Sequence, residues 1–367
     1  MDRKNFWLWA VGGISVLLVS SGIFFITLPK QSSPNRPRPV HSGIVTPTSG
    51  SAAPTTPSSS TPTPSENAPF VITTMTHMEE DFTDDTNKKV FEKHVIDMRW
   101  AMDLFDEYGA KLTFETDQPF AKANTNWGIN ILKEAIAQGH GVGTHAGFGA
   151  KAGLSLDELT EKFIENKTLV DNLVGAENNQ GVSGGTGPTD WILGAAAAGF
   201  HFYDGVTGFG YLSMPASNRP SSWTNSYIIN TGYHDSIPPE LIDRIYPIPM
   251  KDATDFVPDA GAPVTMMSGD IGELSSLGDG RTNCFPSCVL EQDDVDAVEG
   301  SIKEILSIRD TSRFAKMNFH IPMKLLTSKN ETVLRSMLAM IQEYTDAGKI
   351  SWDTQLGAYK QYVRLGE

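Results

Sequence analysis

Short apolar runs alternate with amphipathic segments from Pro69 to the end of the chain. Residues 69–77 are rich in β-branched side chains, and residues 93–109 then place apolar side chains at helical spacing before Gly109, a usual helix stop. Strands that alternate with helices in this way predict a parallel sheet. About six or seven such repeats predict an α/β fold, a (β/α) barrel of about seven strands. No G-x-G-x-x-G follows the first strand, which disfavours a dinucleotide site.

The expected elements follow from this periodicity. Strands are expected at 69–77, 110–116, 140–145, 181–185, 200–205 and 316–322, and helices at 93–109, 127–139, 155–175, 189–199, 293–310 and 330–348. Ser155, with Glu158 three residues on, predicts a capping box at the start of its helix. Residues 208–290 are rich in Gly, Pro, Ser and aromatic residues, and are expected to form long loops with short elements that line a site.

The N-terminal region has a different organisation. Phe6–Leu28 carries no charge, and its length of about 23 residues is enough to cross a hydrocarbon core of roughly 30 Å. Residues 1–30 are therefore predicted to be a cytoplasmic tip and an uncleaved transmembrane anchor. Residues 31–67 are dominated by Pro, Ser and Thr and cannot bury enough apolar surface to fold, which predicts a disordered linker. Residues 68–367 are predicted to be a folded domain outside the cytoplasm, on a single-pass membrane protein.

The net charge limits the classes of binding partner, and the two cysteines bear on the disulfide state. The formal net charge of −15 predicts repulsion from nucleic acid and from anionic lipid headgroups, and says little about neutral glycans. The two cysteines, Cys284 and Cys288, lie four residues apart. A small disulfide loop is the favoured interpretation in an oxidising compartment, with free thiols or a metal site as alternatives.

Polar side chains gather where the expected strands end, and the carboxyl ends of barrel strands are where functional residues cluster. His77 and Glu79 lie two residues apart and so share one face, while His145 ends the third strand. Two imidazoles and a carboxylate suit Zn²⁺ or a similar divalent ion. His320 ends a late strand and is a candidate acid. His140, at the entry of the third strand, is predicted to be structural.

Two further residues are candidates for contacting a substrate. Asp204 ends the strand near 202, and the indole ring of Trp191 is of a kind that stacks on sugars, although packing is an equally good use for it. Paired carboxylates such as Glu79 and Glu115 leave a glycosidase open as an alternative.

The order of these motifs resembles the polysaccharide deacetylases, the fourth carbohydrate esterase family. YGAKLTFET and QGHGVGTH are similar to that family's G-x-x-A-T-F-F and GHEIGNH segments, GAAAAGFHFYDG to a later helix-to-strand step, and NFHIP to its final His motif. The resemblance covers about residues 68–367, apart from 208–290. It implies an incomplete (β/α) barrel that removes acetyl groups from glycans with a metal held by an Asp and two His, a further Asp as base and the late His as acid.

Carried over, the resemblance makes His145 a ligand and His320 the acid, with Glu79 and Asp81 or Glu80 in place of the family's Asp pair. The departures define a divergent member with an altered metal motif. THMEED stands where the family has TFDDG, the second metal His falls at Gly149, and GGTGPTD lacks the family's Arg. We hypothesise that His77 replaces the lost imidazole. The expected function is a membrane-tethered deacetylase acting on a cell-envelope or other polysaccharide, and the alternatives are an inactive glycan-binding module and a glycosidase-like barrel.

Overall fold

The computed structural model describes residues 67–79, 82–148, 153–236, 240–278 and 289–366, all within one compact unit. No helix among these residues is long and apolar enough to cross a membrane. The predicted anchor and linker lie outside the described residues, as do Glu80, Asp81, Gly149 and the two cysteines. The predictions for those residues therefore stay predictions.

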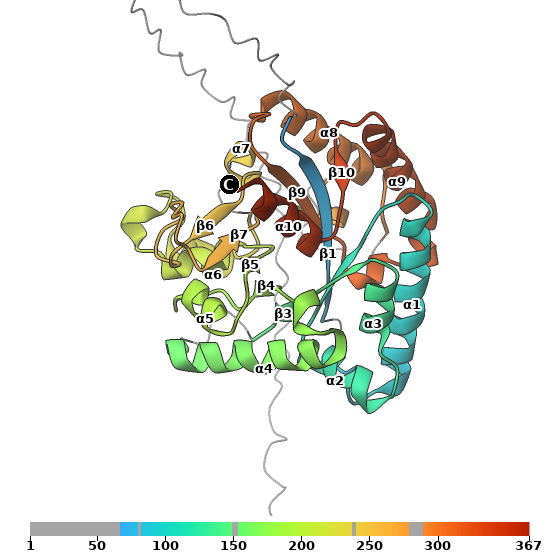
Figure 1. Ribbon diagram of the computed structural model, residues 1–367, viewed down its shortest axis with the longest axis horizontal. Coiled ribbons are helices and arrows are strands. Elements are labelled where there is room, and N and C mark those ends of the chain that lie inside the picture. The colour runs from blue at the N-terminus through green and yellow to red at the C-terminus, as the bar shows by residue number, and fades with distance from the viewer. Residues whose placement is uncertain (1–66, 80–81, 149–152, 237–239, 279–288, 367) are drawn as a thin grey trace, which may run out of the picture. The chain divides into compact units, whose positions relative to one another are not determined.

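The domain is built on a ten-stranded sheet in the order β6-β7-β5-β4-β3-β2-β1-β9-β8, with β10 also paired to β1 (Figure 1). The strands are β1 (Phe70–Met78), β2 (Thr113–Thr116), β3 (Gly141–Ala146), β4 (Gly181–Gly184), β5 (Phe202–Tyr203), β6 (Ile248–Met250), β7 (Val264–Met266), β8 (Asp270–Glu273), β9 (Ala315–His320) and β10 (Ser351–Trp352).

Every strand pair is parallel except β6 with β7. The prediction of a parallel sheet that alternates with helices is thus confirmed. The prediction of about seven strands was too low, because β6, β7 and β8 all lie in the segment expected to form long loops with short elements. The strands at the two ends of the order, β6 and β8, are not paired with each other in the described part of the chain, so the barrel is incomplete.

Ten α-helices accompany the described strands. They are α1 (Lys88–Asp106), α2 (Gln118–Asn126), α3 (Ile131–Ala137), α4 (Leu156–Val174), α5 (Trp191–Ala197), α6 (Asn225–Asn230), α7 (Leu241–Arg244), α8 (Gln292–Ile308), α9 (Glu331–Asp346) and α10 (Gln355–Leu365). In Figure 1, α4 and α5 pack together, as do α8 and α9. The predicted capping box at Ser155 and Glu158 is present. Helix α2 was not predicted; the Asp117 side chain accepts a hydrogen bond from the Phe120 N–H and starts it.

Apolar side chains close the amino end of the sheet. Val71 near the start of β1, Phe202 at the start of β5 and Phe314 just before β9 form one buried cluster with Leu356 and Tyr362 of α10. A larger cluster buries the opposite face of β1 and β9 against α1, α8 and α9. The amino end is therefore filled by packing, which leaves the carboxyl ends of the strands to hold polar groups.

Candidate metal centre

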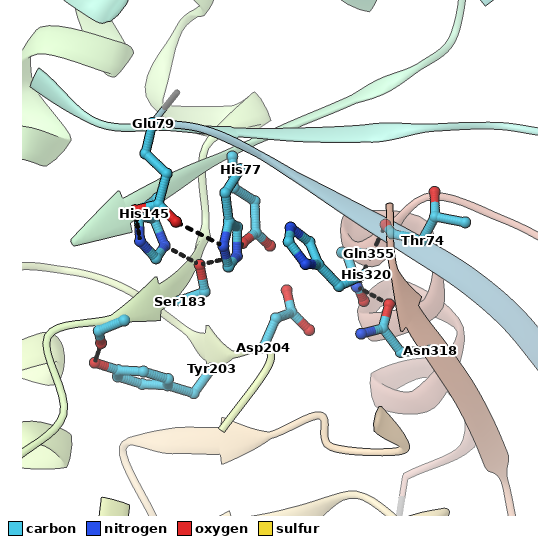
Figure 2. Close-up of polar contacts among 12 residues, drawn as sticks. Thr74, His77, Glu79, His145, Ser183, Tyr203, Asp204, Asn318, His320 and Gln355 are labelled. Atoms are coloured by element: carbon cyan, nitrogen blue, oxygen red, sulfur yellow. Dashed lines mark hydrogen bonds and ion pairs between the residues drawn. The ribbon is translucent and has the colours of Figure 1, made fainter. Parts of the chain in front are cut away.

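The pairing of four adjacent strands sets four polar side chains side by side at the carboxyl end of the sheet. His77 on β1 is the register partner of Glu115 on β2, and His145 on β3 is the register partner of Ser183 on β4. Parallel strands bring their carboxyl ends to one edge, where His77, His145 and Ser183 converge (Figure 2) and Glu115 contacts His77. Gly184 leaves the room that His145 needs: a Cβ atom at this positive-φ position would lie 2.8 Å from Cε1 of the ring.

The predicted ligands His77, Glu79 and His145 meet in this cluster. Glu79 Oε1 lies 3.7 Å from His77 Nδ1, and Glu79 Oε2 lies 3.0 Å from His145 Nε2. One potential ligand atom from each residue lies within 4.8 Å of the others. The two imidazole rings stack with their centroids 3.9 Å apart. The structure thus places together the three side chains that the sequence singled out.

The donor set fits a divalent ion of the zinc class. A tetrahedral ion with ligand atoms at about 2 Å holds neighbouring ligand atoms about 3.3 Å apart. Each Glu79 oxygen lies near this separation from one imidazole nitrogen, Oε2 at 3.0 Å from His145 and Oε1 at 3.7 Å from His77. Two nitrogens and one carboxylate form a three-ligand protein set that leaves a coordination position open, as catalytic zinc sites do.

The electrostatics of the cluster also demand positive charge. Burial lowers the pKa of His77, but contacts with Glu115 and Glu79 outweigh it and raise that pKa to about 10. Burial raises the pKa of Glu79, and contacts with His145 and His77 overcome it and hold that pKa well below its ordinary value. Burial and the nearby charge of His77 lower the pKa of His145. The carboxylates therefore require a cation, whether a bound ion or a protonated imidazole.

Glu115 and Ser183 are the members of the cluster that the sequence reasoning did not assign to a metal site. Glu115 is 1 % exposed, and its Oε2 lies 3.2 Å from His77 Nε2. Ser183 is fully buried, and its Oγ lies 2.8 Å from His145 Nδ1 and 3.2 Å from His77 Nε2. Glu115 could have been found from the sequence, because a carboxylate is unusual inside a strand that is expected to be buried. Nothing in GVSGG distinguishes Ser183.

The chain of contacts from Ser183 through His145 to Glu79 has the connectivity of a nucleophilic triad. The hydroxyl is fully buried, however, so it cannot reach a substrate carbonyl. The burial of Glu115 likewise weakens the glycosidase alternative, because its carboxylate is 1 % exposed and contacts the same imidazole as Glu79. The arrangement suits metal binding better than either alternative.

His320, the predicted acid, lies next to the ligand pair at the end of β9. Its ring centroid is 4.6 Å from that of His77, and its Nδ1 is 3.9 Å from Oε2 of Glu273 on β8. Its Nε2 is buried and has no hydrogen-bond partner among the described residues. Burial and the nearby positive charge of His77 hold the pKa of His320 well below its usual value. The ring is therefore neutral near pH 7.

Asp204, a predicted substrate contact, lies inside the barrel beside the histidines (Figure 2). It is 1 % exposed, and its Oδ1 accepts a hydrogen bond at 3.1 Å from Nζ of the fully buried Lys316. The same ammonium donates to the backbone oxygens of Met267 and Ser268. Burial raises the pKa of Asp204 to about 7 despite the ammonium. At least one of its oxygens is thus committed to an internal ion pair.

The expectation that Trp191 contacts substrate was wrong. The indole is fully buried at the start of α5, in a cluster that includes Leu159, Phe163 and Tyr203. Its Nε1 donates to the backbone oxygen of Gly210, so the ring is used for packing and offers no face to a sugar. Trp191 is the first residue of a short helix, and the sequence does not show whether its side chain faces the sheet or the solvent. In the structure it faces the core.

The fold and the site together define an open (β/α) barrel with two imidazoles and a carboxylate, side chains able to hold a metal ion, at the carboxyl ends of its strands. No family profile and no curated protein matches the chain. Among solved structures, a polysaccharide deacetylase from Mycobacterium smegmatis aligns at 10 % identity with a TM-score of 0.51, covering 82 % of this chain and 92 % of that one.

Two other solved structures align almost as well. The allantoinase Puue aligns at 11 % identity and a TM-score of 0.50, covering 80 % of this chain and 90 % of its own. A polysaccharide deacetylase from Pseudomonas aeruginosa PAO1 aligns at 10 % identity with a TM-score of 0.50, covering 81 % of this chain and 92 % of that one. At these identities the likeness is one of fold. The domain has the fold of the polysaccharide deacetylases, as the motif resemblance predicted.

Proposed function

We propose that the domain is a divalent-metal-dependent hydrolase that removes acetyl groups from a glycan. The observation that carries the proposal is the convergence of His77, Glu79 and His145 at the carboxyl end of a deacetylase-like barrel, with one potential ligand atom of each within 4.8 Å of the others. Zn²⁺ is the ion that two imidazoles and a carboxylate suit best. When bound, such an ion polarises the acetyl carbonyl and acidifies water.

The chain's own side chains divide the remaining work. His320 is neutral and has an unpartnered Nε2 in the described structure, so this atom is suited to hydrogen-bond a reacting group and to take or give one proton. Asp81, two residues after Glu79, is proposed as the base. In the overall reaction a water oxygen bonds to the acetyl carbon, the bond from that carbon to the sugar nitrogen or oxygen breaks, and a proton passes to the leaving atom.

We further propose that the domain works outside the cytoplasm, tethered to a membrane. The support is the uncharged run Phe6–Leu28 followed by the Pro-, Ser- and Thr-rich linker at 31–67. A polysaccharide of the cell envelope is the substrate class that such a tether would make accessible. The net charge of −15 is compatible with a neutral glycan and disfavours nucleic acid.

Acetate release tests the proposal. The full-length chain is incubated with N-acetylated and with O-acetylated oligosaccharides, before and after treatment with a chelator and after Zn²⁺ is restored. We expect acetate from at least one class, lost on chelation and recovered with Zn²⁺. Glycan binding without turnover would instead show a binding module, and new reducing ends without acetate would show a glycosidase.

A further inference from the structure

The two imidazoles of the candidate site each have one nitrogen facing Glu79 and one facing away. Nδ1 of His77 and Nε2 of His145 face the Glu79 carboxylate, at 3.7 and 3.0 Å. The other two nitrogens face Ser183 of β4, which contacts both of them (Figure 2), and Nε2 of His77 also faces Glu115 of β2. The site thus has a ligand side and a supporting side.

Two buried side chains, Glu115 and Ser183, contact the imidazole nitrogens on the supporting side. Glu115 Oε2 and Ser183 Oγ each lie 3.2 Å from Nε2 of His77, and Ser183 Oγ lies 2.8 Å from Nδ1 of His145. Glu115 and Ser183 are 1 % and 0 % exposed, so neither is placed to contact a glycan. Any effect they have on the site must pass through the imidazoles.

The tautomer of each ring decides whether it can bind an ion. A neutral imidazole carries one N–H, and only its other nitrogen has a lone pair free for a metal. An acceptor on the supporting side draws the N–H there and leaves the lone pair on the ligand side. A carboxylate is a strong acceptor for His77, and the serine oxygen can accept from His145.

Burying the Glu115 carboxylate costs solvation free energy, which suggests that the carboxylate has a role at the site. A buried carboxylate is unfavourable unless it is paired. Glu115 Oε2 has no hydrogen-bond partner in the described part of the chain, and its ion-pair contact is with Nε2 of His77, 3.2 Å away. In this chain, the carboxylate on β2 accompanies the histidine on β1, and the two are register partners.

We propose that Glu115 and Ser183 are positioning residues that fix the tautomers of His77 and His145, so that Nδ1 of His77 and Nε2 of His145 face a divalent ion. The inference rests on the proposed function, because it presupposes an ion bound on the ligand side. It extends that proposal by naming the groups that allow His77 and His145 to bind a divalent ion.

Metal affinity is the direct test. The Zn²⁺ dissociation constant of the full-length chain is measured by competition with a chromogenic chelator, for wild type, Glu115→Gln and Ser183→Ala. The visible spectrum of the Co²⁺-loaded chain reports ligand geometry in the same samples. We expect each substitution to weaken Zn²⁺ binding by about 10- to 100-fold and to shift the Co²⁺ spectrum, because outer partners of ligating histidines have effects of this size.

A matched control lies one residue from His77. Thr76 is fully buried on β1 and its side chain, on the opposite face of the strand, makes no hydrogen bond within the described residues. Thr76→Val is nearly isosteric and should leave both the affinity and the spectrum unchanged. Far-UV circular dichroism of every variant separates loss of the site from loss of the fold.

The outcomes distinguish the two proposals. If wild type binds Zn²⁺ and both folded variants bind it equally well with the same Co²⁺ spectrum, the positioning roles are refuted and the proposed metalloenzyme stands. If one variant misfolds, the other carries the test alone. If wild type binds neither ion, both proposals are refuted.

Discussion

Strand β3 has a histidine at each end, and the two ends of the barrel give these residues opposite surroundings. His140, just before the strand, is 2 % exposed, and its Nδ1 accepts a hydrogen bond from the Leu112 N–H. His145, near the end of the strand, stacks on a second imidazole and contacts a carboxylate. The same kind of side chain thus binds a backbone N–H at the packed amino end and takes part in the candidate metal site at the carboxyl end.

Along β3, the amino end contributes mainly to folding stability and the carboxyl end mainly to the candidate metal site. At the amino end, removing a side chain should cost folding free energy and leave the candidate site intact. At the carboxyl end, it should cost metal binding and leave most of the stability.

The largest effect is expected at the carboxyl end. His145→Ala removes a ligand itself, so its Zn²⁺ affinity should fall by more than the factor of about 100 that bounds outer-partner effects. Acetate release should fall with it. Isothermal titration with Zn²⁺ and an acetate assay check this, and the thermal midpoint of the metal-free protein should change little. A variant with wild-type affinity would remove His145 from the ligand set.

The packed end should show the reverse pattern. Phe314 is fully buried in the cluster that closes the amino end of the sheet. Phe314→Ala should lower the free energy of unfolding by about 3–5 kcal/mol through lost burial and a residual cavity. Urea unfolding measures the loss, and Zn²⁺ affinity of the folded variant should match wild type. A large loss of affinity would show that the two ends are coupled.

His140 should make stability depend on pH. Burial lowers its pKa to about 4, partly opposed by the charge of Asp106. Because the folded state binds this proton less readily than the unfolded state, the contribution is present above about pH 6.5 and is lost as pH falls through 4. Unfolding of His140→Asn and wild type, compared from pH 7.5 to 4, should show a pH-dependent loss of about 1–3 kcal/mol in wild type that the variant lacks. Parallel pH profiles for the two proteins would contradict this assignment.

The smallest effect is expected far from the strand ends. Ser155 accepts a hydrogen bond from the Glu158 N–H and caps α4, and both residues are exposed. Ser155→Ala should cost about 1 kcal/mol of stability and leave Zn²⁺ binding unchanged. Chemical denaturation measures the cost, and Ser155→Asn, which retains a capping oxygen, should recover most of it. If the asparagine fails to do so, capping is not the reason for the loss.

The sequence predicted the elements that have strong periodicity. Helices such as α4 and α9 carry apolar side chains at helical spacing over more than four turns, and β1 is a nine-residue strand rich in β-branched side chains. Strands β6 and β7 are three residues each and lie among Gly- and Pro-rich segments, where no alternation can develop. Their pairing is decided by tertiary contacts.

The candidate site was predictable only in part for a related reason. His77 and Glu79 lie two residues apart on one extended segment, so their shared face follows from the sequence. The meeting of His77 with Glu115 depends on the register between β1 and β2, which one sequence does not supply. The stacking of His145 on His77 depends further on β2 lying between their strands.

Metal content tests the central claim most directly. Full-length wild type and His77→Ala are purified without chelator, and bound divalent metal is measured per chain by elemental analysis. The account predicts a stoichiometric divalent ion in wild type and its loss in the variant, because His77 supplies the imidazole that the altered motif lacks. Metal-free wild-type protein that also fails to take up Zn²⁺, or unchanged metal content in His77→Ala, would contradict it.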